Sequence, residues 1–227
     1  MSRAPVQWNT AMVGWLGKML RARQPLDRVR ALARFRPAYL KPVYSLLLGL
    51  TDPLVKLSMG QTAEILAHRF GLSRESQDVN ALQSHRRLAA AFDAGDMRVE
   101  VETLYDTNER FYVEDTGLRR DTDLERLAQL KPVFDRKYGS VTSGNSSQVT
   151  DGAAMLLLAS EAAVQRHGLS VLGEWVDHEW AGVDPSQMGL GPVHAVAQLL
   201  TRQKMKMRDL QQMELNEAFA AQVLACQ

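Results

Sequence analysis

The stretch MELNEAFAAQVLACQ, from Met213 to Gln227, decides how the second half of this chain is expected to fold. Its first residues form an apolar, strand-like run, and the alanine-rich residues after Glu217 favour a helix. Asn216 lies between the two, where its amide could cap the helix or hold a water or a carbonyl oxygen beside the helix N-terminus. A strand that turns directly into a helix is typical of a layered α/β sheet.

The residues before this junction also alternate between apolar, strand-like runs and helix-forming segments. They comprise the apolar run Ala153–Ser160, a helix over Glu161–His167 ended by Gly168, the strand-like Val171–Trp180 and a helix after Gly191. Strands that alternate with helices indicate an α/β sheet. We therefore predict an α/β fold class, in which a mainly helical domain over residues 1–130 precedes part of an α/β core over residues 131–227.

The first half of the chain carries helical patterns separated by proline and glycine. One apolar helix face repeats at helical spacing until Pro25 ends it, and a second short helix follows. Further along, Gly71 and Gly95 are the natural ends of two helices, and Ser73 is the expected cap of the second. The predicted elements are helices over 12–20, 26–36, 61–70, 73–95 and 123–130, with a short strand near 99–105.

The composition is that of an ordinary globular protein, with 45% apolar and 23% charged residues in 227. The single cysteine, Cys226, excludes an internal disulfide framework and favours a reducing, cytoplasmic location. The five histidines show no metal-ligand spacing, so no metal is predicted. The longest apolar runs, such as Ala153–Ala159, are far shorter than the roughly 20 residues that span a bilayer, and the amino terminus does not resemble a signal peptide.

A basic, amphipathic segment occupies residues 12–41. Between Lys18 and Lys41 it carries eight Lys or Arg against one acid, Asp27. Such a segment could lie on an anionic surface, either a membrane or a nucleic acid. Alternatively, its arginines could form the solvated face of a subdomain that handles substrate. Both interpretations stay open at the level of sequence.

The loop VTSGNSSQVTDG, from Val141 to Gly152, combines small and hydroxylated residues. Small side chains let a ligand approach the backbone, and the hydroxyl and amide groups supply hydrogen-bond donors. A generic polar loop would have a similar composition. Cys226 could act as a nucleophile, but no base is evident near it in the sequence, and a bystander thiol explains it equally well.

Five blocks follow one another along the chain in a recognisable order. They are MGQTAEILAHRFGLSRESQD from Met59, SH from Ser84, LKPVFDRKYGSVTSGNSSQVTDGAA from Leu130, DPSQMGLGPV from Asp184 and LNEAFAAQ from Leu215. Together they resemble the thiolases. The basic segment from Lys18 to Leu57 is most similar to the long-chain members, including the β subunit of trifunctional complexes.

The resemblance implies an incomplete thiolase fold, in which the domain before residue 130 covers coenzyme A. Thiolases transfer an acyl group between a cysteine and CoA, cleaving 3-ketoacyl-CoA or condensing two acyl groups, in fatty-acid metabolism. The implied partners are acyl-CoA and CoA, bound as substrates with no further cofactor, and a second copy or a companion subunit. Contact with a membrane surface through residues 12–41 is a further expectation, whereas a nucleic-acid partner is not expected.

The resemblance also assigns candidate site residues. Asn216 matches the asparagine that holds a water in an oxyanion hole, and Phe219 lines the same pocket. Ser147 matches the serine that bonds the pantetheine arm of CoA, and Ser143 belongs to the same wall.

Three more residues complete the implied site. Arg119 or Arg120 would meet the nucleotide end of CoA, and Met59 falls in a block that contacts substrate. Ser58 stands where some members have histidine, which departs from the pattern.

The catalytic cysteines of the family have no counterpart here. The nucleophile belongs to a segment before residue 1, and the Gly-His-Pro motif and the second cysteine belong beyond Gln227. We therefore expect a truncated middle portion of a thiolase-type acyltransferase, without turnover as an isolated chain. The alternative is a non-catalytic module that binds CoA, a partner or a membrane.

Overall fold

A computed structural model describes residues 6–150 and 152–227, which divide into two compact units. The first unit ends at Met59 and the second begins at Gly60. Asp151, part of the predicted binding loop, lies outside the described residues. The domain boundary expected near residue 130 stays a prediction.

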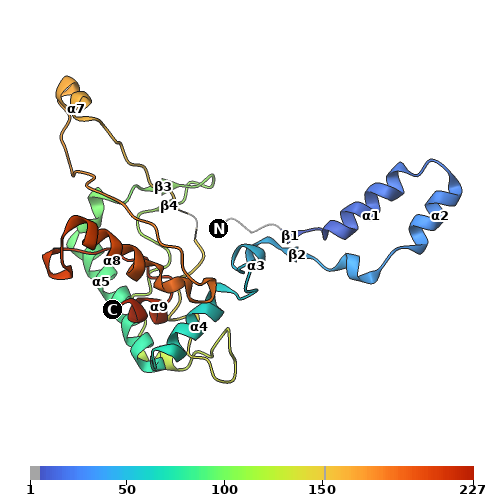
Figure 1. Ribbon diagram of the computed structural model, residues 1–227, viewed down its shortest axis with the longest axis horizontal. Coiled ribbons are helices and arrows are strands. Elements are labelled where there is room, and N and C mark those ends of the chain that lie inside the picture. Colours follow the sequence, from blue (N-terminus) through green and yellow to red (C-terminus); the bar gives the residue numbers. More distant parts are fainter. Residues whose placement is uncertain (1–5, 151) are drawn as a thin grey trace. The chain divides into compact units, whose positions relative to one another are not determined.

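The first unit is a helical hairpin closed by two short strands (Figure 1). Strands β1 (Val6–Gln7) and β2 (Val43–Tyr44) pair antiparallel, with Val6 opposite Tyr44. Asn9 caps the first helix, because its Oδ1 accepts a hydrogen bond from the Ala11 amide at 2.9 Å. The helical elements of the unit are α1 (Thr10–Arg21), α2 (Pro25–Ala33), the 3₁₀ turn η1 (Pro37–Leu40) and α3 (Ser45–Gly49).

The second unit contains most of the helices predicted from the sequence. These helices are α4 (Met59–Arg69), α5 (Arg74–Ala94), α6 (Leu124–Ala128), α7 (Glu161–His167), α8 (Gly191–Gln203) and α9 (Ala220–Cys226). The structure adds the 3₁₀ turns η2 (Asp96–Val99), η3 (Pro185–Leu190) and η4 (Met207–Asp209). Ser73 caps α5 by accepting from the Ser76 amide at 3.0 Å. Gly71, Gly95 and Gly168 follow helix ends with φ of +63°, +82° and +59°, as predicted.

Three of the strand predictions are wrong in detail. In the part of the chain that the structure describes, the second unit has one strand pair, β3 (Leu104–Tyr105) with β4 (Phe111–Tyr112), and Val99 ends a 3₁₀ turn. Val171–Trp180 and the run before Asn216 are irregular chain. An isolated strand is unstable because its backbone needs a neighbouring strand for hydrogen bonds, and these segments have none among the described residues.

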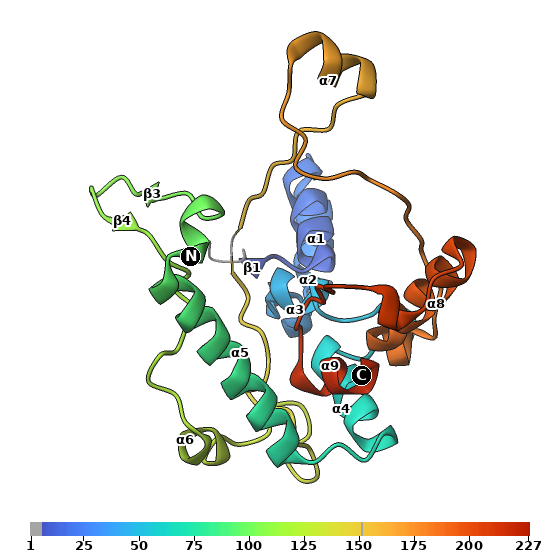
Figure 2. The same ribbon diagram turned by 90° about the vertical axis from the view of Figure 1, so that its left-hand side faces the viewer.

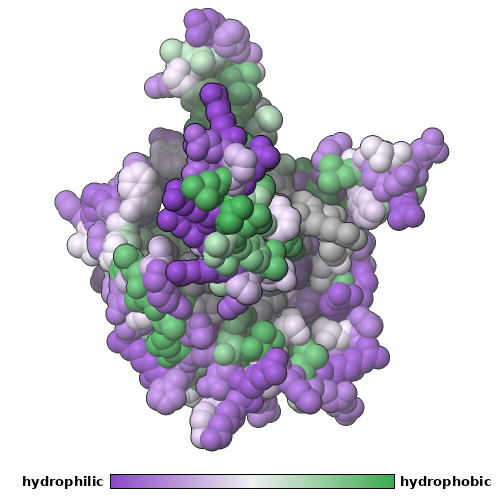
Figure 3. All heavy atoms as spheres, turned by 90° about the vertical axis from the view of Figure 1, so that its right-hand side faces the viewer, coloured by the Kyte–Doolittle hydropathy of each residue, from purple (hydrophilic) through white to green (hydrophobic). Residues whose placement is uncertain are grey.

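Several of these apolar segments are therefore exposed to solvent. Leu156 and Leu172, which belong to the two apolar runs, are almost fully exposed. Figure 3 shows apolar side chains gathered in patches among hydrophilic ones on one face of the molecule.

The core of the second unit lies where α4, α9 and the loop after Ser140 meet. Ala63 and Ala67 of α4 pack with Val141 and with Ala221 of α9, and the two helices lie side by side (Figure 2). Small residues allow this close approach. At Gly60, for example, a Cβ atom would overlap the ring of Phe134, which packs against the same cluster.

Candidate functional site

A cavity of about 380 Å³ lies where four segments of the second unit meet. The segments are the middle of α5, the chain at Asp115–Leu118, the loop Gly144–Gln148 and the chain before α9. The lining includes Ser84, His85, Ser146, Ser147, Asn216 and Glu217. Two residues predicted separately from the sequence, Ser147 and Asn216, therefore line one cavity although they are far apart in the chain.

Helix α4 fixes the start of the loop that begins at Val141, the small and hydroxylated stretch noted in the sequence. The Glu64 carboxylate accepts hydrogen bonds from the backbone amides of Ser140 at 2.9 Å and Val141 at 3.0 Å. From α5, Gln77 Nε2 donates to the Ser140 hydroxyl at 2.9 Å. Val141 is fully buried, so the carboxylate satisfies an amide that water cannot reach.

A buried relay of polar side chains holds the tip of the same loop. Arg74 Nε donates to Asp78 Oδ2 at 2.7 Å, and Asn145 Nδ2 donates to Asp78 Oδ1 at 2.9 Å. Asn145 Oδ1 in turn accepts from the Thr142 amide at 2.8 Å. Asp78, Asn145 and Thr142 are all buried, so these bonds satisfy polar groups that water does not reach.

The loop is joined to the start of α9 by a short antiparallel bridge. Ser146 pairs with Phe219, the Ser147 amide donates to the Ala218 carbonyl at 2.9 Å, and the Ala220 amide donates to the Asn145 carbonyl at 2.9 Å. These bonds place Asn216 and Ser147 at the same cavity. Helix α9 begins at Ala220 with Phe219 at its cap position, so Asn216 is not the helix cap that the sequence left open.

Phe219, which the resemblance places in the pocket, lies beside the cavity and packs against the core rather than lining it. Its ring meets the ring of Phe134 edge to face, with the centroids 6.1 Å apart. Phe219 therefore connects the cavity wall to the core of α4 and α9.

His85 belongs to the SH block of the sequence but was not among the predicted site residues, and the structure places it in the cavity lining. Its Nδ1 accepts a hydrogen bond from the Arg119 amide at 3.3 Å, which leaves Nε2 as the protonated nitrogen of the neutral ring. Burial lowers the pKa of His85, the Arg119 charge lowers it further, and Glu217 opposes the shift. His85 is therefore a neutral hydrogen-bond donor at neutral pH.

The two candidate arginines differ in their surroundings. The Arg120 guanidinium is bound by Asp93 at 2.8 Å and by Glu114 at 3.1 Å, and these carboxylates raise its pKa. Arg119 lies beside His85, and its side chain forms no ion pair within residues 6–150 and 152–227. Arg119 is thus the one of the two arginines whose charge is not paired with a carboxylate among the described residues, and its backbone amide bonds the cavity residue His85.

Ser147 and Asn216 are the predicted site residues that line the cavity, whereas Arg119, Arg120, Phe219, Ser143 and Met59 do not. Ser143 is exposed on the loop, two residues before the buried Asn145. Met59 begins α4 and is the last residue of the first unit. Their roles in a site stay predictions.

Cys226 lies near the end of α9, away from this cavity. Its thiol donates to the Gly189 carbonyl at 3.2 Å, and burial raises the pKa of the Cys226 thiol. A thiol with a raised pKa is protonated at neutral pH and is a poor nucleophile. The described residues contain no cluster of three or more His, Cys, Asp or Glu that could hold a metal ion.

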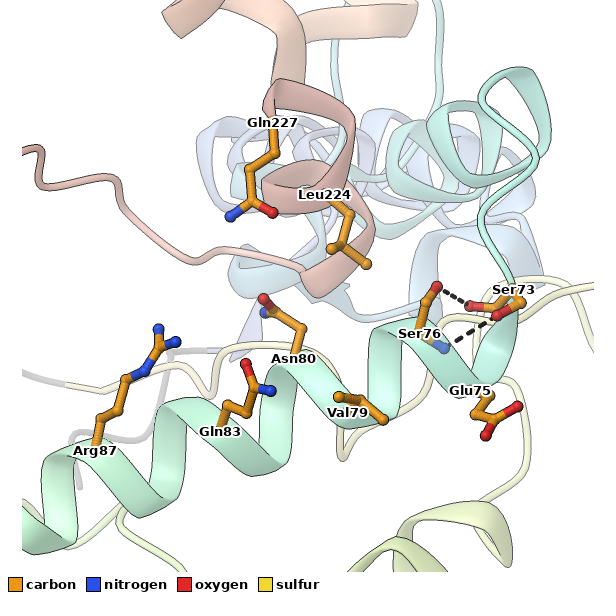
Figure 4. Close-up of a pocket in the computed structure, with 9 residues that line it drawn as sticks. All are labelled: Ser73, Glu75, Ser76, Val79, Asn80, Gln83, Arg87, Leu224 and Gln227. Atoms are coloured by element: carbon orange, nitrogen blue, oxygen red, sulfur yellow. Dashed lines mark hydrogen bonds between the residues drawn. The ribbon is translucent and has the colours of Figure 1, made fainter. Parts of the chain in front are cut away.

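A second cavity lies on another side of α5, against α9 (Figure 4). Its lining consists of Ser73, Glu75, Ser76, Val79, Asn80, Gln83, Arg87, Leu224 and Gln227. Ser76 hydrogen-bonds to Ser73, the cap residue of α5. The helix cap therefore explains why these two serines lie at this cavity. None of the residues predicted for a site lines this cavity, so the first cavity is the candidate functional site.

Comparison with known proteins identifies the class. Residues 8–162 match the family described as thiolase, N-terminal domain, and residues 169–227 match thiolase, C-terminal domain. The chain belongs to the thiolase family. The fold prediction of an incomplete, thiolase-like architecture is confirmed.

Individual relatives extend this comparison. The chain is 37% identical over 223 residues to 3-ketoacyl-CoA thiolase of Pectobacterium carotovorum subsp. carotovorum, covering 97% of this chain and 50% of the relative. It is 42% identical over 182 residues to mitochondrial 3-ketoacyl-CoA thiolase of Rattus norvegicus, covering 79% and 46%. Human mitochondrial 3-ketoacyl-CoA thiolase in complex with CoA matches with a TM-score of 0.79 at 39% identity, covering 85% of this chain and 49% of that chain. The chain thus spans about half the length of the curated relatives it matches.

Proposed function

We propose that this chain forms part of a 3-ketoacyl-CoA thiolase, an enzyme that transfers acyl groups to and from CoA. The observation that carries the proposal is the meeting of Ser147 and Asn216 at one cavity. The relatives named above are 3-ketoacyl-CoA thiolases, and one solved relative is a complex with CoA. A CoA thioester needs an elongated polar wall and hydrogen-bond donors near its carbonyl oxygen, and hydroxyl and amide side chains supply both.

The residues at the cavity, and Arg119 beside it, then take the following proposed roles. The Asn216 amide would orient a water or donate to the thioester oxygen, and the Ser147 hydroxyl would bond the pantetheine arm. We assign the nucleotide phosphates to Arg119, because Arg120 is already paired with two carboxylates. His85, neutral and protonated at Nε2, would contribute one more donor to the same wall.

We further propose that the 227-residue chain binds CoA but does not turn over thioesters by itself. Its single cysteine is held as a thiol by burial and by its bond to Gly189. Thiolase chemistry needs a thiolate that attacks the acyl carbon and a second acid or base, and neither role fits Cys226. The predicted second copy or companion subunit and the cytoplasmic location stay predictions.

Saturable binding of CoA to the purified chain, measured by isothermal titration calorimetry, tests this proposal. Ser147→Ala should weaken binding about three- to tenfold, because it removes one hydrogen bond from the pantetheine wall. The matched control is Ser170→Ala, an exposed serine outside the cavity, which should leave the affinity unchanged. Absence of saturable binding, or equal weakening by both substitutions, would contradict the proposal.

A further inference from the structure

His85 joins two segments at the cavity that we assign to CoA. The ring lies on α5 and lines the cavity, and its Nδ1 accepts a hydrogen bond from the Arg119 backbone amide at 3.3 Å. The two residues are 34 positions apart in the chain, so this bond connects the helix to the segment that carries Arg119. Asp115 and Leu118 of the same segment also line the cavity. His85 therefore helps to fix the point from which the Arg119 side chain extends.

The attachment of this segment to α5 also involves Arg120, which pairs with Asp93 at 2.8 Å. These two side chains are 41% and 69% exposed, so water screens the pair and it contributes little. The His85 ring, by contrast, is partly buried. Its bond to the Arg119 amide needs an unprotonated Nδ1, because only a nitrogen with a free lone pair accepts a hydrogen bond. The contact is therefore one that a proton can remove.

Protonation of His85 would break this contact. A neutral imidazole accepts at one nitrogen and donates at the other, whereas the imidazolium donates at both. A proton on Nδ1 would point at the Arg119 amide proton, and the new charge on the ring would repel the Arg119 guanidinium. Burial of the ring and the Arg119 charge accordingly lower the pKa of His85.

Glu217 offers the protonated ring a different partner. Its charge opposes the lowering of the His85 pKa by burial and by Arg119. The other ionisable groups of the described lining come from the same two segments and are Asp115 and Glu214. Because Glu217 directly follows Asn216, attraction of the ring to Glu217 would also act on the chain at Asn216.

We propose that His85 is a positioning residue: its neutral form holds the Arg119 segment in place for the CoA phosphates, and its protonation releases that segment and weakens CoA binding. This inference rests on the CoA-binding function proposed above. Because the pKa of His85 lies below its ordinary value of 6.5, the neutral form prevails at neutral pH and is lost only in more acidic solution. CoA affinity should therefore be full above about pH 6.5 and fall as the pH drops below it.

Isothermal titration calorimetry with CoA at about pH 7.5 and about pH 5.5 measures this dependence. We expect the affinity of the unchanged chain to fall about three- to tenfold further than that of His85→Gln, because only the unchanged chain loses a hydrogen bond at the site. In the variant, the glutamine oxygen can accept from the Arg119 amide at either pH. The terminal phosphate of CoA also titrates, with a pKa of about 6, and its contribution is the same in both chains.

His167→Gln is the matched control, because it removes an exposed histidine of α7 from outside the cavity. It should keep the pH dependence of the unchanged chain. Glu217→Gln removes the charge that opposes burial and Arg119 at His85, so it should move the loss of affinity to a lower pH. A loss at the same pH in this variant would contradict the role assigned to the ring.

The pKa of His85 gives a second readout, which a purely structural role would not change. Protonation and CoA binding are linked, so CoA must lower the pKa of His85 if CoA binds the neutral form more tightly. A proton NMR titration with and without CoA measures this pKa, and the His85 signal is the one missing from the His85→Gln spectrum. A pKa that CoA raises or leaves unchanged would overturn the proposal.

An equal fall in affinity in His85→Gln and in the unchanged chain would also overturn it, while leaving the proposed CoA binding intact. Loss of the pH dependence in His167→Gln would do the same. Absence of saturable binding at neutral pH would instead contradict the proposed function, and this inference with it.

Discussion

Replacing Asp78 with alanine is expected to lower the free energy of unfolding by about 3–5 kcal/mol, because it removes one partner of a buried ion pair. Asp78 is 3% exposed and accepts hydrogen bonds from both Arg74 and Asn145. Without the carboxylate, the half-buried Arg74 guanidinium loses its counter-charge, and the buried Asn145 amide keeps only its bond to the Ser140 carbonyl. Urea denaturation of the purified chain measures the change.

Asp121→Ala is the matched control for this substitution. Asp121 also lies 2.8 Å from an arginine, Arg126, but 78% of the Asp121 side chain is exposed. Exposed ion pairs contribute little because water screens them, so the control should be several times milder. Equal destabilisation by the two substitutions would show that burial of the relay does not govern its contribution.

Leu66→Ala is expected to lower the free energy of unfolding by about 2–5 kcal/mol, because it leaves a cavity in the core. Leu66 is 1% exposed and lies under η3, where a Cβ atom on Gly189 would come within 2.7 Å of it. Thermal or urea unfolding reports the loss.

The control for Leu66 is the same truncation at Leu172, which is fully exposed. Leu172→Ala removes the same atoms without leaving a void, so it should alter stability by less than about 0.5 kcal/mol. A similar loss at both positions would mean that Leu66 does not belong to a cooperative core.

Helices and their ends were predictable from the sequence because their signals are local. Ser73 and Gly95 bound α5 through a cap and a positive φ, and both effects depend on residues within one helical turn. Pro25 likewise separates α1 from α2.

The strands and the support of the site depend on residues far apart in the chain. Val171–Trp180 has a strand composition, yet a strand forms only beside a neighbour, and composition alone does not indicate that neighbour. The bond between Asp78 and Asn145 likewise joins residues 67 positions apart. Arg74 and Asp78 are four residues apart, a spacing that suits an ion pair on one helix. The burial of Asp78 depends on distant residues, so the local sequence pattern does not predict it.

The candidate site was predictable in part. The resemblance to thiolases selected Ser147 and Asn216, which the structure places at one cavity. His85 was missed as a cavity residue because its character comes from Arg119 and Glu217, both distant in sequence. The choice between Arg119 and Arg120 required the ion pairs of Arg120, which the sequence does not display.

Thiolysis tests the central claim most directly, namely that this chain holds the CoA wall of a thiolase site but no activated thiolate. The purified 227-residue chain would be assayed with acetoacetyl-CoA and a longer 3-ketoacyl-CoA in excess CoA, with a full-length thiolase as positive control. We expect no turnover by the chain alone. Turnover that Cys226→Ala abolishes would contradict the account, because it would make the buried Cys226 thiol the nucleophile.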